Sequence, residues 1–113
     1  MSEEDILQAY EWLVQYHPEV TTGTNPAFFE AELPFGYTGI TLPSDIIDII
    51  FIDPDYESMG ELVNTVAHEL MHAQQSLWQN FIDNYLTQGH QEIYEIADWI
   101  QREYEKQQRG SYK

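Results

Sequence analysis

The chain has 113 residues, 42% of them hydrophobic and 14% aromatic, so it can bury one core and is too apolar for a disordered acidic tail. Its 20 acidic and 4 basic residues give a formal charge of -16, which argues against direct nucleic-acid or anionic-membrane binding and stays compatible with a cationic partner. The absence of cysteine excludes disulfides, thiolate ligands and cysteine nucleophiles, so any metal must be held by His, Asp or Glu.

The N-terminal segment MSEEDILQAYEWL carries no basic region followed by an apolar stretch. No run in the chain approaches the ~18 apolar residues that a spanning helix needs. We therefore expect a soluble cytoplasmic protein without a membrane partner, and we expect residues 1–113 to form a single domain.

The first predicted element is an amphipathic helix. Ser2 and Asp5 have the spacing of a capping box, and apolar residues then recur at helical spacing until Pro18 ends the run. Residues 18–26, PEVTTGTNP, are rich in turn formers and predict a loop.

Three β-prone segments follow, at residues 27–33, 37–42 and 45–52. Because the connections between them are short, an antiparallel meander is favoured. The third segment consists mostly of isoleucine and phenylalanine, which predicts the central or most buried strand.

Two further helices are predicted after the strands. Ser58 and Glu61 form a second capping-box pattern, which opens a helix that extends to about Trp78. Residues 79–89 suggest a helical turn and then a loop, and a last amphipathic helix runs from His90 to near Gly110. The predicted fold class is α+β: an N-terminal helix, a small and mostly antiparallel three-stranded sheet, a central helix and a C-terminal helix.

The central helix carries the motif HExxH, here H68 E69 L70 M71 H72. Residues four apart lie on one helix face, so the rings of His68 and His72 can converge on one ion. Glu69 flanks that face, where its carboxylate can reach a metal-bound water without ligating the metal. Neutral imidazoles leave zinc strongly Lewis-acidic, and a glutamate can then act as general base.

The motif has an ordinary alternative. Apolar residues form a stripe on this helix, and His68 and His72 fall on the remaining polar face. A solvated helix face without any metal would show the same pattern.

A catalytic zinc site has three protein ligands and one open position, so two histidines need a third group. The downstream segment TQGHQEIYEIADWI offers His90, Glu92 and Glu95. His90 follows Gly89 at the start of the last helix and shares a stripe with its apolar residues, whereas Glu95 points largely away. His90 is the preferred third ligand, and the two glutamates stay open as alternatives.

The segments TVAHELMHAQQ and GHQEIYEIADWI together resemble the SprT-like zinc metalloprotease domain. The resemblance implies a helix, a small antiparallel sheet and then the zinc helices, with His68, His72 and His90 as ligands of Zn²⁺ and Glu69 as general base. Gln91 stands where the family has glycine. The chain lacks the cysteine-rich ribbon and the basic extensions of family members that act on DNA-linked proteins, so the DNA role is not implied.

Two classes of function follow. The first is a zinc-dependent metallopeptidase acting on a protein or peptide substrate, with His90 as third ligand or, in a gluzincin-type variant, Glu92 or Glu95. The second is a non-catalytic acidic interaction protein, such as a phage or mobile-element accessory, in which the charge attracts a basic partner and any metal is structural or vestigial.

Overall fold

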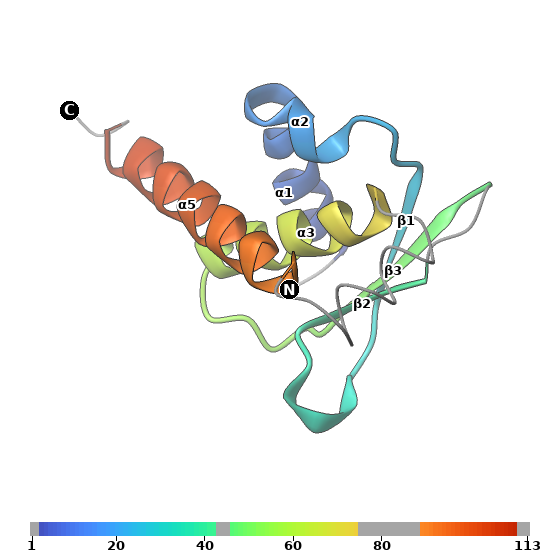
Figure 1. Ribbon diagram of the computed structural model, residues 1–113. Coiled ribbons are helices and arrows are strands. Elements are labelled where there is room, and N and C mark those ends of the chain that lie inside the picture. Colours follow the sequence, from blue (N-terminus) through green and yellow to red (C-terminus); the bar gives the residue numbers. More distant parts are fainter. Residues whose placement is uncertain (1–2, 43–45, 75–88, 111–113) are drawn as a thin grey trace.

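The computed structural model describes residues 3–42, 46–74 and 89–110, with the backbone alone for residues 89–91. Within these ranges the chain forms four helices, one short 3-10 helix and one three-stranded sheet (Figure 1). In chain order the elements are α1 Glu3–Tyr16, α2 Pro18–Thr21, β1 Pro26–Glu30, η1 Pro34–Gly36, β2 Gly39–Leu42, β3 Asp48–Ile52, α3 Met59–Gln74 and α5 Gly89–Gly110. The predicted α+β class, with an N-terminal helix before the sheet and a C-terminal helix after it, is confirmed, and the structure adds α2 ahead of β1.

Helix α3 is the centre of the molecule. It packs against α1, α2 and α5 and also against strands β2 and β3. Most of its apolar side chains are buried, and together with residues from α1, α2, β3 and α5 they form one hydrophobic core. Because a helix that is apolar around most of its surface must be buried, its sequence already requires this central place.

The sheet has the strand order β1-β3-β2, so β3 is central, as its composition predicted. β1 pairs with β3 in parallel and β2 pairs with β3 in antiparallel orientation. The predicted antiparallel meander is therefore wrong. The most apolar strand takes the middle position, where Ile50 and Ile52 are fully buried, and the connection through η1 is long enough to carry β2 to the far side of it.

The predicted loop at residues 18–26 is partly wrong, because α2 occupies its first four residues. Pro18 ends α1 but begins α2, since proline lacks the N–H that the first turn of a helix leaves unpaired. The predicted start of α3 is confirmed: Ser58 Oγ accepts a hydrogen bond of 3.2 Å from the Glu61 backbone N–H. The predicted capping residue Ser2 of the first helix lies outside the described residues. The predicted extension of α3 to Trp78 and the predicted turn and loop at residues 79–89 lie outside the described residues, except for Gly89, which is not loop but the first residue of α5.

Within the ranges that the structure describes, none of the helices combines the length and the apolar character needed to cross a membrane.

Candidate active site

The two histidines of the HExxH motif lie side by side on α3. Their Nε2 atoms are 3.1 Å apart, and their ring centroids are 4.7 Å apart. Two nitrogens that bind one zinc ion at 2.0–2.1 Å with tetrahedral geometry are about 3.3 Å from each other. The spacing of the two rings therefore fits a shared metal ion.

Burial excludes the alternative of a solvated helix face. His68 is only 8% exposed and His72 only 9%. Polar groups removed from water to this degree need partners or a bound ligand. This strip of α3 is part of the interior of the protein.

Glu69 is buried beside the histidines, with 5% of its surface exposed. Its carboxylate faces strand β2, where the hydroxyl of Thr41 donates a hydrogen bond of 2.8 Å to Oε1. The other carboxylate oxygen, Oε2, lies 4.0 Å from His68 Nε2. This is too far for a direct hydrogen bond but close enough for both groups to contact one water molecule.

Strand β2 leaves room for this carboxylate at Gly39, which has no side chain. A Cβ atom on Gly39 would lie 2.7 Å from Glu69 Cγ and 3.0 Å from Oε2. Any side chain at position 39 would therefore displace Glu69. Thr41, two residues further along and on the same face, supplies the hydrogen bond, so β2 both makes room for the carboxylate and orients it.

Burial raises the pKa of Glu69 from 4.5 to about 7, although the hydrogen bond from Thr41 acts in the opposite direction. A general base works best when its pKa is near the pH of operation. Perturbed carboxylates of this kind are concentrated at functional sites.

Helix α5 covers one side of the histidine pair. The half-exposed ring of Tyr94 packs on His68, with centroids 4.6 Å apart and an interplanar angle of 48°. Tyr94 thus reaches the site from the helix that the sequence predicted to supply the third ligand.

The structure places the three candidates for the third ligand as follows. His90 lies in the first turn of α5, one turn before Tyr94, and its side chain lies outside the described residues. Glu92 and Glu95 are exposed. Among the side chains described, no three His, Asp or Glu residues form a group that could hold a metal ion, so neither glutamate joins His68 and His72 there.

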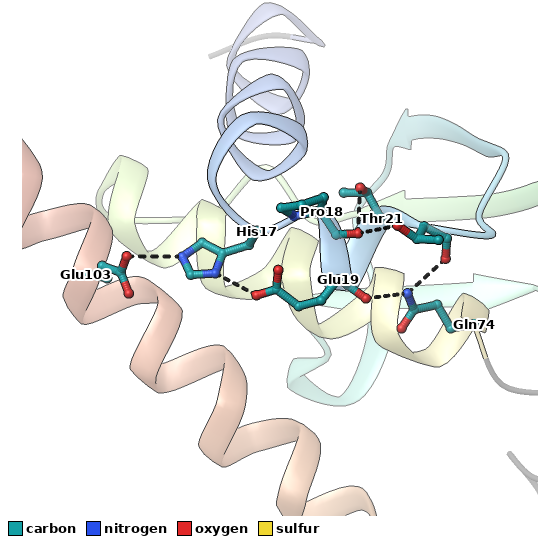
Figure 2. Close-up of polar contacts among 7 residues, drawn as sticks. His17, Pro18, Glu19, Thr21, Gln74 and Glu103 are labelled. Atoms are coloured by element: carbon teal, nitrogen blue, oxygen red, sulfur yellow. Dashed lines mark hydrogen bonds and ion pairs between the residues drawn. The ribbon is translucent and has the colours of Figure 1, made fainter.

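Another histidine, His17, is buried at the junction of α1 and α2, and no sequence motif pointed to it. Figure 2 shows its ring between two carboxylates: Nδ1 is 2.8 Å from Glu19 Oε1, and Nε2 is 3.5 Å from Glu103 Oε1. The ring also packs against Trp12 and Trp99, with centroid distances of 5.3 and 5.4 Å. His17 joins α1, α2 and α5.

Gln74, at the end of α3, connects this junction to the helix of the candidate site. Its side-chain amide donates hydrogen bonds of 2.7 Å to the backbone oxygen of Glu19 and of 3.0 Å to that of Thr22 (Figure 2). The helix that carries the HExxH motif is thereby fixed at its last turn.

Two residues of the site, Gly39 and Thr41, were not found by sequence reasoning. The predicted strand 37–42 contains both, and period-2 alternation places them on the same face. That signal gives the face but not the helix residue opposite, which depends on how the sheet packs.

No protein-family model matches the chain, and no match was found among curated proteins or solved structures. The function is therefore argued from the geometry of the site.

Proposed function

We propose that the protein is a zinc-dependent metallopeptidase in which His68 and His72 bind the metal and Glu69 is the general base. The observation that carries the proposal is the placement of Glu69. A carboxylate that is almost fully removed from water is unfavourable for stability, yet this one lies beside two buried imidazoles and is oriented by Thr41. A catalytic role explains that combination, whereas packing alone would favour an apolar residue.

The assignment of the third ligand belongs to the same proposal. We assign it to His90, because His90 lies in the first turn of α5 and Tyr94, one turn later on the same helix, packs on His68. Zinc held by neutral ligands would supply a water with a lowered pKa and would polarise a carbonyl group. Glu69 would accept the proton of that water and transfer it to the leaving amine.

The position of β2 favours an extended peptide as substrate. Among the described residues β2 is bonded to β3 along one edge, and no strand pairs with its other edge. A peptide in extended conformation can add to such an edge through main-chain hydrogen bonds. It would then pass close to Glu69, because Gly39 and Thr41 contact that side chain. The resemblance to SprT-like domains supports the same reaction class.

The decisive variant is Glu69→Gln, which keeps the size of the side chain and removes its basicity. We expect it to retain about one zinc ion per chain, measured by elemental analysis, and to lose cleavage of fluorescein-labelled casein by roughly 100-fold or more. Glu61→Gln, an exposed glutamate on the same helix, is the matched control and should cleave normally. Full cleavage by the zinc-loaded Glu69→Gln protein would rule out the mechanism.

A second set of variants tests the ligands. His90→Ala should reduce zinc content to near background, whereas Glu92→Ala and Glu95→Ala should bind zinc as the parent does. Loss of zinc in one glutamate variant and retention in His90→Ala would move the third ligand to that glutamate, giving the gluzincin-type arrangement.

A further inference from the structure

The three strands have a second face that is entirely apolar. Residues such as Phe28, Ile50 and Thr41 face the helices, so the alternate residues face the opposite side. Strand register arranges those alternate residues in two rows: Ala27, Ile49 and Leu42 in one, and Phe29, Phe51 and Ile40 in the other. A sheet with a solvated face normally alternates apolar and polar residues, and this one does not.

This second face, which we call the outer face, is accessible. Phe29 is 46% exposed and Leu42 is 52% exposed, whereas Ile50 on the opposite side of the same sheet is fully buried. The rings of Phe29 and Phe51 pack together with centroids 5.8 Å apart, so these residues of adjacent strands share one apolar patch on the outer face. Contiguous exposed apolar surface of this kind is typical of a binding site.

The part of the chain that forms the three strands carries negative charges only. The segment from Pro26 to Glu57 contains seven acidic residues and no lysine or arginine; the acidic residues are Glu30, Glu32, Asp45, Asp48, Asp53, Asp55 and Glu57. All four basic residues of the chain lie in the last twelve positions, at Arg102, Lys106, Arg109 and Lys113. In Figure 1 the C-terminal half of α5, which carries Arg102, Lys106 and Arg109, points away from the sheet.

The charge selects the kind of partner. A second copy of the chain would bring another -16 charge against the first, and nucleic acids and anionic membranes would be repelled in the same way. A basic protein would be attracted, and its apolar side chains could cover the outer face while its basic residues meet exposed carboxylates of the strand-bearing segment, such as Glu30 and Glu32. Three strands spaced by about 4.8 Å span about 10 Å, which matches the diameter of one helix.

We infer that the outer face of the sheet is a docking site for an amphipathic helix of a basic protein, with Phe29 and Leu42 as its most accessible contacts. This site is separate from the candidate active site and holds whether or not the protein is a peptidase. The apolar row of the partner helix would lie on the two rows of the sheet, and lysine or arginine residues beside it would face the carboxylates.

The probe for the test is a synthetic helical peptide with leucine on one face and lysine on the other. Two control peptides replace its lysines by glutamate or its leucines by serine. Binding is measured by isothermal titration calorimetry to the parent, to Phe29→Ser and Leu42→Ser, and to the matched controls Leu7→Ser and Val14→Ser, which alter exposed apolar residues of α1. Amide chemical shifts of the parent map the contact surface.

We expect the leucine–lysine peptide to bind at a ratio of one to one and to shift amides of β1, β2 and β3. Phe29→Ser and Leu42→Ser should each weaken binding roughly tenfold, and the α1 variants less than about twofold. The inference is overturned if the α1 variants weaken binding equally, if the leucine–glutamate peptide binds as well, or if the shifted amides lie on the helices. It is also overturned if the parent sediments as a dimer that Leu42→Ser dissociates. If a variant fails to fold, the amide chemical shifts of the parent with the peptide decide whether the contact surface is the outer face of the sheet.

Discussion

Two places in the molecule bury histidine, and they do so in different ways. At the junction of α1 and α2 both ring nitrogens of His17 face carboxylates, on opposite sides of the ring. On α3 the Nε2 atoms of His68 and His72 face each other at 3.1 Å. Carboxylates on both sides fix the orientation of a structural imidazole, whereas two imidazole nitrogens directed at one point suit a shared cation. Burial alone therefore does not distinguish a structural histidine from a ligand, but the direction of the ring nitrogens does.

The carboxylates beside these histidines, Glu19 and Glu69, also differ, because their pKa values shift in opposite directions. Burial alone would raise the pKa of Glu19, but the hydrogen bond and the charge of His17, together with a backbone hydrogen bond, bring it below its usual value. The pKa of Glu69 is instead raised to about 7. The first carboxylate is held in its charged form, as a structural ion pair requires, and the second can exchange a proton near neutral pH.

The largest expected effect concerns zinc. His68→Ala should weaken zinc binding by roughly 100-fold or more, because it removes a ligand, and His17→Ala should leave zinc affinity unchanged. Competition with a chromophoric chelator measures both. If His17→Ala abolished binding and His68→Ala did not, the roles of the two regions would be reversed.

The next effect is the pH dependence of stability without metal. The folded protein holds the proton of Glu69 up to about pH 7, whereas the unfolded chain releases it near 4.5. The contribution of protonated Glu69 to the free energy of unfolding is complete below pH 4.5. It is lost as the pH rises to about 7, a change of about 3 kcal/mol.

Urea unfolding of the metal-free parent and of Glu69→Gln over this pH range isolates the contribution of Glu69 to stability, because all other carboxylates titrate in both proteins. As the pH rises from 4.5 to about 7, the free energy of unfolding of the parent should fall relative to that of Glu69→Gln. A constant difference would mean that Glu69 is not desolvated.

A smaller loss of stability is expected on substitution of the structural histidine, His17. His17→Ala removes a ring that packs on Trp12 and Trp99 and leaves Glu19 and Glu103 without their shared partner. The free energy of unfolding should fall by about 2 kcal/mol. Glu103→Gln should cost less than about 1 kcal/mol, because that carboxylate is partly exposed and 3.5 Å away. Equal losses in the two variants would show that packing of the ring contributes little.

The smallest effect concerns the orientation of Glu69. Thr41→Val keeps the shape of the side chain and removes the hydroxyl that donates to Oε1. Peptidase activity should fall about tenfold with zinc content unchanged, since a misplaced general base loses efficiency but binds no metal. Thr41→Ser, which retains the hydroxyl, should recover most of the activity. Unchanged activity in Thr41→Val would remove Thr41 from the site.

Sequence reasoning predicted the local features well. The capping pair Ser58 and Glu61, the helical period of α3 and the apolar composition of β3 are each contained within a few neighbouring residues. The same is true of the HExxH spacing, which places His68 and His72 on one face. Strand order was wrong because short connections say which strands are close in sequence, not which one is most favourable in the middle of the sheet.

The chain by itself determined the three main helices and three strands, the class of fold, the strong negative charge and the presence of two histidines one helical turn apart. Tertiary structure alone decided that these histidines are buried, that Gly39 and Thr41 admit and orient Glu69, that Tyr94 packs on His68, and that His17 is enclosed by carboxylates. The physical reason is the range of the interactions. Helix period and capping act between residues three or four apart, whereas the hydrogen bond from Thr41 to Glu69 joins residues 28 positions apart and exists only once the sheet has packed against α3.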